Sequence, residues 1–141
     1  MSDASAIDRE TFLRLVRETM ADVAKMRIDV EEMTRGHARV RLGFDPGQLR
    51  PGGTISGPTI FTVADLALYA ATLSVIGLVP LAVTTDTTIH FLRRPKPADL
   101  LCEARVIKAG KRMIVAECSV CSEGDEEPVA HVVGSYSLPP R

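Results

Sequence analysis

A long apolar stretch in the middle of the chain, carrying a single charged side chain, constrains the fold most. Asp65 is the only Asp, Glu, Lys or Arg between Arg50 and Asp86, and it lies within GPTIFTVADLALYAATLSVIGLVPLAV. A buried carboxylate without a partner is costly, so Asp65 should be paired, protonated or part of a site. The pattern leaves equally open that this carboxylate faces solvent or an interface at the edge of a helix.

This apolar stretch has the start and stop signals of a single helix. Pro58 suits the first turn, with Ser56 or Gly57 as the N-cap, and Gly77 suits the end. The sequence therefore predicts a helix over residues 58–76 that is buried on most sides. Its internal carboxylate and its end at Gly77 favour a core helix over a membrane span.

The segments on either side of this helix predict an amphipathic helix and six strands. Residues 8–24 place apolar side chains at helical spacing, and six further segments alternate with a period of two. The predicted strands are residues 26–33, 37–45, 83–92, 100–108, 113–122 and 128–138. Residues 46–53 are expected to form an irregular loop. The fold class is therefore α+β, because only a curved sheet can cover a helix that is apolar on most sides.

The strand over residues 83–92 carries polar side chains that are candidates for a site. Strict alternation predicts that Thr84, Asp86, Thr88 and His90 share one face, opposite Val83, Ile89 and Phe91. His90 and Asp86 could pair with a serine, but the chain has no G-x-S-x-G nucleophile elbow. We therefore expect His90 to be an ordinary polar residue.

The chain length and composition predict one domain over residues 1–141, of which residues 1–25 are an N-terminal helical extension. A net charge of −1 and an aromatic content of 4% argue against nucleic-acid binding. Three cysteines and a polar, acidic N-terminus predict a protein of the reducing cytoplasm, without a signal peptide. We expect no membrane association.

Three stretches together resemble the hotdog fold, and within it the PaaI-type acyl-CoA thioesterases. They are GTISGPTIFTVAD (residues 53–65), TTDTTIHFLRRP (residues 84–95) and ARVIKAGKR (residues 104–112), and the resemblance extends over residues 26–138. It implies a long central helix wrapped by a curved antiparallel sheet of about six strands. It also implies a homodimer or homotetramer with sites shared between chains, an acyl-CoA substrate and no cofactor.

The first stretch matches the family's HGG-x-x-x-x-x-x-D helix start, with three departures. Ser56 stands in place of the family's His, Gly57 matches its first Gly and Pro58 replaces the second. Arg50 stands where the family often has Asn or Gln. The resemblance therefore carries over Asp65 and Gly57 as the matching pair.

A thioesterase needs an oxyanion donor and a base or nucleophile beside the thioester carbonyl. The N–H of Gly57, at a helix N-terminus, is a fixed donor, and Asp65 is the expected base or nucleophile. Ser56 is either a polar contact for the substrate or a helix cap. Thr84 and Asp86 are expected to line the thioester end of the site.

A basic segment is the candidate for binding the phosphates of coenzyme A. Residues 93–112 hold seven basic side chains against two acidic ones. Cations at a pocket mouth bind phosphate, although such a run can equally be a solvated sheet edge. The expected phosphate-binding residues, preferred over Arg105 and Lys108, are Arg93, Arg94, Lys111 and Arg112. Arg50, outside this segment, is a further expected substrate-binding residue.

Two further readings compete with hydrolysis. A hotdog hydratase acting on enoyl thioesters would need a His paired with an acid near the helix, and only His90 could supply it. An acyl-CoA binding or sensing protein would keep the pocket without the chemistry.

A metal site is not expected, because Cys118 and Cys121 lie three apart on a strand and so point to opposite faces.

Overall fold

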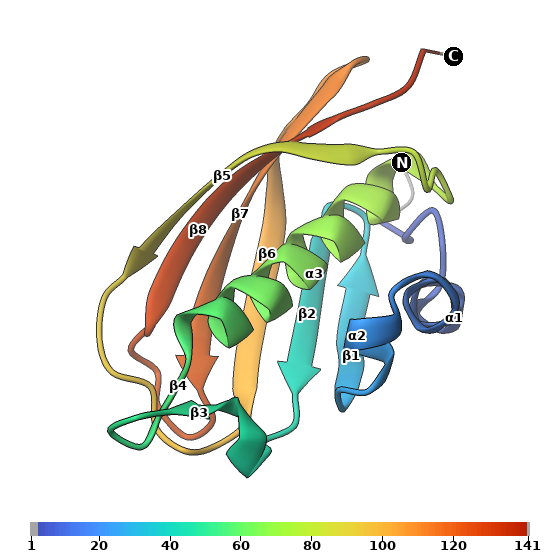
Figure 1. Ribbon diagram of the computed structural model, residues 1–141. Helices are drawn as coiled ribbons and strands as arrows, with labels where there is room; N and C mark the ends of the chain where they lie inside the picture. The colour runs from blue at the N-terminus through green and yellow to red at the C-terminus, as the bar shows by residue number, and fades with distance from the viewer. Residues whose placement is uncertain (1–2, 141) are drawn as a thin grey trace.

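A six-stranded antiparallel sheet curves around one long helix in the computed structural model, which describes residues 3–140 (Figure 1). The predicted architecture is confirmed. The strand order in the sheet is β1-β2-β6-β7-β8-β5. The elements are α3 (Gly57–Ile76), β1 (Ile28–Thr34), β2 (His37–Leu42), β5 (Val83–Phe91), β6 (Leu100–Ala109), β7 (Met113–Ser122) and β8 (Ala130–Ser137).

Helix α3 begins and ends where the sequence predicts. Ser56 caps its first turn by accepting a hydrogen bond from the N–H of Thr59 at 3.3 Å. Gly77 ends the helix in a conformation with φ of 86°, which favours glycine. By length and composition α3 could cross a membrane, but 61% of its apolar window is buried inside the fold. The helix therefore forms the core that the sheet encloses.

Alternation along the strands separates an apolar inner face of the sheet from a polar outer face. In β2 the side chains of Ala38, Val40 and Leu42 are buried against the helix side. On the outer face Arg41 pairs with Glu31 at 2.7 Å, among other acidic partners. The core therefore lies between α3 and the concave side of the sheet.

The predicted N-terminal helix is two helices, α1 (Arg9–Thr19) and α2 (Ala21–Ala24), which lie beside β1 (Figure 1). α1 is held to the fold by the fully buried Phe12 and the nearly buried Val16. Arg9 donates hydrogen bonds to the main-chain oxygens of Val30, at 2.9 Å, and of Glu31, at 3.3 Å. The outer edge of β1 is therefore covered by this N-terminal segment.

The segment over residues 46–53 is more ordered than predicted. It contains a short 3₁₀ helix (Pro46–Gln48), and two strands, β3 (Leu49–Arg50) and β4 (Thr54–Ile55), pair across a glycine turn. Strands of two residues are too short to produce a detectable alternation. This small hairpin leads directly into the N-terminus of α3.

A bulge in β5 overturns the predicted faces of this strand. Thr84 pairs with Tyr136 across to β8, but Asp86 pairs with Ser135, so Thr85 is an extra residue. Directly opposed residues point to the same side of a sheet, so Thr84 faces α3 together with the buried Tyr136. The prediction that Thr84 and Asp86 share a face is therefore wrong: Asp86 lies on the outer face.

Candidate active site

The half-buried carboxylate of Asp65 lies on α3, between this helix and the strands β5 and β8. Its Oδ1 accepts a hydrogen bond from Tyr136 Oη at 3.0 Å and another from Thr84 Oγ1 at 3.4 Å. Tyr136 Oη also lies 3.2 Å from the main-chain oxygen of Asp65. Asp65, the one charged residue of the apolar stretch, is therefore paired with two hydroxyl groups, and within residues 3–140 it forms no ion pair.

The surroundings of Asp65 change its acidity in two opposing ways. Burial raises the pKa of Asp65 above its ordinary value, while the hydrogen bonds from Tyr136 and Thr84 lower it. The net effect is a raised pKa. Burial and the neighbouring Asp65 carboxylate raise the pKa of Tyr136 far above its ordinary value, so the phenol keeps its proton and acts as a donor. Asp65 is thus a stronger base than an exposed aspartate, which favours a role in accepting a proton.

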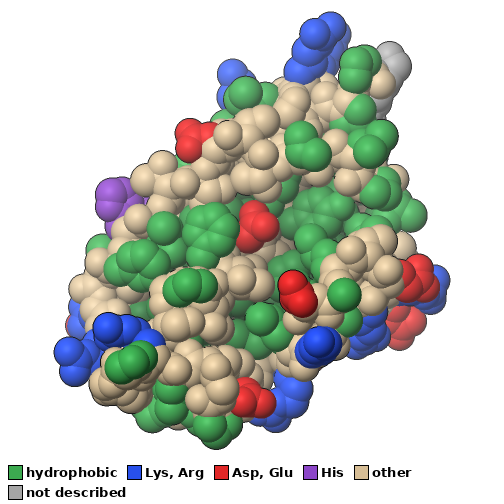
Figure 2. Space-filling view, in the orientation of Figure 1, with side chains coloured by type: hydrophobic (Ala, Val, Ile, Leu, Met, Phe, Trp, Pro, Cys, Tyr) green, Lys and Arg blue, Asp and Glu red, His purple; other side chains and the backbone are tan. Residues whose placement is uncertain are grey.

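A pocket of about 340 Å³ opens beside Asp65. Its walls are mostly apolar and come from α1, α3, the start of β5 and the end of β8. The lining residues are Leu15, Thr19, Met20, Asp65, Tyr69, Pro80, Ala82, Val83, Thr84 and Tyr136. Figure 2 shows hydrophobic side chains gathered over the middle of this face, with isolated acidic side chains among them. An apolar cleft with a few convergent polar groups is typical of a small-molecule site.

Aromatic rings form one wall of this pocket. The ring of Tyr69 stacks on that of Tyr136, with centroids 6.0 Å apart and an angle of 19°. Phe12 packs against Tyr69 at 5.9 Å in a tilted arrangement. The N-terminal helix therefore supports the wall as well as contributing side chains to the lining.

The start of α3 lies away from Asp65 within one chain. The eight residues from Gly57 to Asp65 span about 12 Å along the helix axis. At Gly57 a Cβ atom would lie 3.3 Å from Cζ of Phe91, at the far end of β5. Ser56 is engaged as the helix cap, and Arg50 is exposed in β3. The structure therefore brings Thr84 to Asp65, but not Gly57, Ser56 or Arg50.

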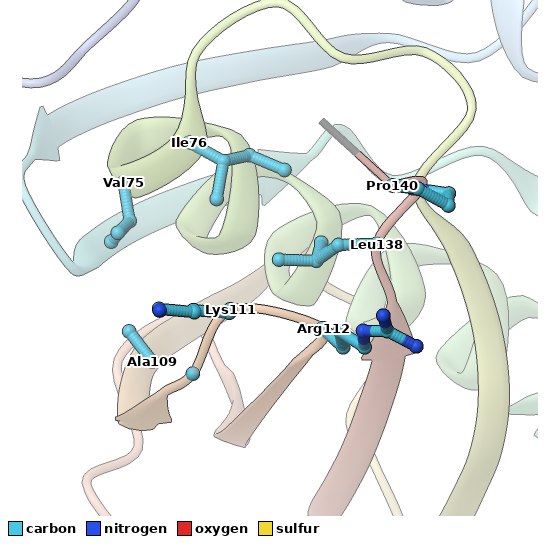
Figure 3. A pocket seen from close by; sticks show the side chains of 8 residues that line it. Val75, Ile76, Ala109, Lys111, Arg112, Leu138 and Pro140 are labelled. Carbon is cyan, nitrogen blue, oxygen red and sulfur yellow. The ribbon is translucent and has the colours of Figure 1, made fainter.

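The predicted phosphate-binding cations fall into two groups. Lys111 and Arg112 line a larger pocket of about 680 Å³ at the C-terminal end of α3. Figure 3 shows these two side chains on one side of the pocket, across from Val75 and Ile76. At the opposite end of β5, Arg93 forms an ion pair with Glu127, and Arg94 is exposed.

The remaining candidates from the sequence are not part of either pocket. Cys118 is buried and Cys121 is half-buried on the other face, as the alternation predicts. His90 lies opposite His131 in the register of β5 and β8, on the outer face of the sheet. Over residues 3–140, no group of three His, Cys, Asp or Glu side chains is placed to hold a metal ion.

Of the residues that surround Asp65, the sequence predicted Thr84 but not Tyr136. Tyr136 lies at an inward-facing position of a predicted strand, so its burial follows from alternation. Its contact with Asp65, 71 positions away, depends on the strand order of the sheet. Tyr69 lies one turn after Asp65 on α3, which is a signal that the spacing could have given.

A long central helix wrapped by a curved antiparallel sheet defines a hotdog-fold protein, and the carboxylate on this helix opens into an apolar pocket. The chain belongs to the thioesterase superfamily, whose family model matches residues 52–129. The match covers α3 and the strands β4, β5, β6 and β7. The family thus supports thioester hydrolysis as the class of reaction.

Individual relatives agree with this assignment. The chain is 31% identical over 111 residues to a provisionally named esterase of Saccharolobus solfataricus, covering 77% of this chain and 71% of the relative. A crystal structure of a provisionally named thioesterase from a Silicibacter species superposes with a TM-score of 0.88 at 34% identity, covering 99% and 97% of the two chains. The PaaI protein from the E. coli phenylacetic acid degradation operon has the same fold, with a TM-score of 0.81 at 24% identity and 94% of each chain covered.

Proposed function

We propose that this protein hydrolyses an acyl-CoA thioester to a free acid and coenzyme A, with Asp65 as the general base or nucleophile. The observation that carries the proposal is the Asp65 carboxylate, with its raised pKa, at the wall of an apolar pocket. Membership of the thioesterase superfamily supports the reaction class. The acyl-CoA substrate and the residue roles are the proposed part.

Two routes from this carboxylate balance chemically. As a base, Asp65 takes a proton from water while the hydroxide adds to the thioester carbonyl, and the tetrahedral intermediate expels the thiolate, which is then protonated. As a nucleophile, Asp65 attacks the carbonyl carbon and expels the thiolate, and water then hydrolyses the mixed anhydride. In both routes the N–H of Gly57, at the helix N-terminus, stabilises the negative charge on the carbonyl oxygen.

A second copy of the chain would bring Gly57 to Asp65. Asp65 lies beside Thr84 at the start of β5, whereas Gly57 lies beside Phe91 at its end. Because β5 is an edge strand, it can pair with a second β5 in antiparallel fashion. Such pairing about the middle of the strand sets the Phe91 end of one copy against the Thr84 end of the other. We therefore propose a homodimer in which each site takes Asp65 from one chain and Gly57 from the other.

The larger pocket is the proposed site for the phosphates of coenzyme A. Tyr136 lines the Asp65 pocket, and Leu138, two residues further along the chain, lines the larger pocket with Lys111 and Arg112. The walls of the two pockets therefore lie close together, and we propose that an extended ligand places its thioester in one and its phosphates in the other. Antiparallel pairing of β5 would also move Arg93 of the second copy toward this end.

One observation favours a second candidate function, acyl-CoA binding without turnover. Ser56, which replaces the family's His, is engaged as a helix cap through Thr59, and Pro58 has no N–H to offer. The hydratase reading has less support, because His90 lies on the outer face of the sheet, away from Asp65. Hydrolysis uses only water, so we propose no cofactor. We also propose that the protein is located in the cytoplasm.

The proposal is tested by measuring thiol release from short, medium, long and aryl acyl-CoA esters, with Asp65→Asn beside the parent. The isosteric change should lower kcat by about 10²–10⁴-fold on the best ester. Binding of coenzyme A, measured by calorimetry, should stay within about twofold of the parent, because the phosphates bind away from Asp65. Full turnover by the variant would refute the role of Asp65. Binding of acyl-CoA without turnover in the parent would establish the non-catalytic alternative.

A further inference from the structure

We infer that Tyr136 and Thr84 are positioning residues that hold Oδ1 of Asp65 and leave Oδ2 as the oxygen that reacts. The inference rests on the proposed function and extends it to the orientation of the carboxylate. Both hydroxyl groups donate to the same oxygen, at 3.0 Å and 3.4 Å. A partial rotation of the carboxylate would lengthen both contacts, whereas a half-turn only exchanges two equivalent oxygens, so at any moment one oxygen is held and the other is left to react.

The phenol also fixes the carboxylate relative to the helix backbone. Tyr136 Oη lies 3.0 Å from Oδ1 and 3.2 Å from the main-chain oxygen of Asp65. One donor thus contacts both ends of the residue, and this limits rotation of the side chain about its own bonds. Precise placement of a reacting group is worth orders of magnitude in rate.

The bulge in β5 makes the second contact possible. Thr85 is the extra residue between Thr84 and Asp86 in the pairing of β5 with β8. Because Asp86 and the rest of β5 follow the regular alternation, the same sequence without a bulge would place Thr85 opposite Tyr136 and turn Thr84 to the outer face. Bulges commonly redirect a side chain next to an active site, and here the redirected side chain is a hydroxyl donor.

The aromatic packing keeps the phenol in place. Tyr136 is 2% exposed, and its ring stacks on Tyr69, which itself packs against Phe12. A buried ring held in this way cannot move to follow a displaced carboxylate. The donor is therefore preorganised, so the carboxylate adapts to the phenol.

The hydroxyl groups are also the principal local influence that favours the charged form of Asp65. Among the described residues that line the pocket, the titratable side chains are Asp65, Tyr69 and Tyr136, from α3 and β8. The lining residues that come from α1, from the loop before β5 and from the start of β5 have no ionisable side chain. Loss of either hydroxyl should therefore move the acid limb of activity to higher pH, because the protonated carboxyl cannot act as a base.

The test compares Tyr136→Phe, Thr84→Val and Thr84→Ser with the parent. Each protein is measured in two ways: the pH profile of kcat/KM, and the pKa of Asp65 from NMR titration of its carboxyl carbon. Tyr136→Phe should raise both the acid limb and the NMR value by about one pH unit and lower kcat about 10–100-fold, with a smaller change in KM. Thr84→Val should shift both in the same direction by less, and Thr84→Ser should restore the parent profile.

The outcomes separate this inference from the proposed function. An unchanged NMR titration and an unchanged pH profile in Tyr136→Phe and Thr84→Val would overturn the inference. If Tyr136→Phe fails to fold, the exposed Thr84 gives the answer through its Val and Ser variants. Full turnover by Asp65→Asn would refute the proposed function alone, and the NMR titrations would still decide whether the hydroxyl groups hold the carboxylate.

Discussion

Asp65 and Tyr136 stand 71 positions apart in the chain and meet through a 3.0 Å hydrogen bond between the carboxylate and the phenol. One residue belongs to the core helix and the other to the sheet that wraps it, so their contact joins the two layers of the fold. The acidity of Asp65 therefore depends on how closely α3 lies on β8. At Gly134 on this strand, a Cβ would lie 3.0 Å from Leu68 of the helix, which shows how close that approach is.

Asp65→Asn should stabilise the protein at neutral pH while removing activity. Burial raises the pKa of Asp65 in the folded state, so the folded protein binds more protons than the unfolded chain between the two pKa values. The stabilising contribution of the protonated carboxyl is complete below the unfolded value of about 3.9 and is lost as pH rises through the folded value. Asparagine carries no charge at any pH. We therefore expect Tm to rise by about 1–3 °C at pH 7 and by less at pH 4.

This expectation is checked by calorimetric melts of both proteins at the two pH values. The proteins need to unfold reversibly for the comparison to hold. A variant that is less stable than the parent at pH 7 would contradict the assigned direction of the pKa shift. An equal gain in Tm at both pH values would mean that it does not come from the charge.

Subunit mixing should reveal whether a site takes residues from two chains. Asp65→Asn removes the base, and Gly57→Pro removes the N–H donor at a position where proline suits the start of a helix. Each homodimer should be inactive. Random mixing makes about half of the dimers mixed, and each mixed dimer has one intact site of two, so about a quarter of the parent activity should return. Co-expression with two affinity tags allows the mixed dimer to be purified and assayed.

The same experiment distinguishes a site contained in one chain. In that arrangement no chain of the mixture carries both Asp65 and Gly57, so mixing restores nothing. Sedimentation of each variant alone confirms that the subunits still associate. A monomeric parent protein would itself remove the shared-site proposal.

Lys111 and Arg112 should matter only for substrates that carry phosphates. Replacing both with Ala should raise KM for an acyl-CoA ester about tenfold or more, because two cations at the larger pocket are lost. An acyl-pantetheine thioester with the same acyl group has no phosphate, so its KM should change by less than about twofold. Steady-state kinetics with the two substrates decides this. An equal loss on both substrates would show a general effect on the fold instead.

Met20 should limit the size of the acyl group. Its half-buried side chain lies at the end of α1 and lines the Asp65 pocket together with Leu15 and Thr19. Met20→Trp should lower kcat/KM for the longest accepted acyl chain about tenfold and leave acetyl-CoA nearly unchanged. Arg17→Ala, exposed on the same helix, serves as the matched control. If the preference for acyl chain length does not change in Met20→Trp, the end of α1 does not determine which acyl groups are accepted.

The sequence was sufficient for the architecture because its signals there are local. The period of the apolar side chains changes from helical to alternating at Gly77 and Val83, and turn residues separate the later strands. The caps at Ser56 and Gly77 are one-residue signals that the structure reproduces. The isolated charge of Asp65 in turn indicated a candidate site before any geometry was known.

The arrangement around that charge depends on contacts that no local pattern carries. The bulge at Thr85 reverses the alternation that placed Thr84 beside Asp86, and bulges leave little trace in composition. Tyr136 reaches Asp65 because β8 lies beside β5 in the sheet, which is a property of strand order. The separation of Gly57 from Asp65 followed from helix geometry alone, and this distance is the basis for the proposed second chain.

The unequal edges of the sheet also limit how large an assembly can grow by strand pairing. The β1 edge is blocked by Arg9, and Ala4 forms a bridge with Thr34 there, whereas β5 has a strand neighbour on one side. A sheet with two open edges could add copies without end and form a fibre. With one edge closed, two copies joined through β5 present only blocked edges to the solution. In the proposed dimer, the N-terminal segment would therefore limit association along the sheet to two copies.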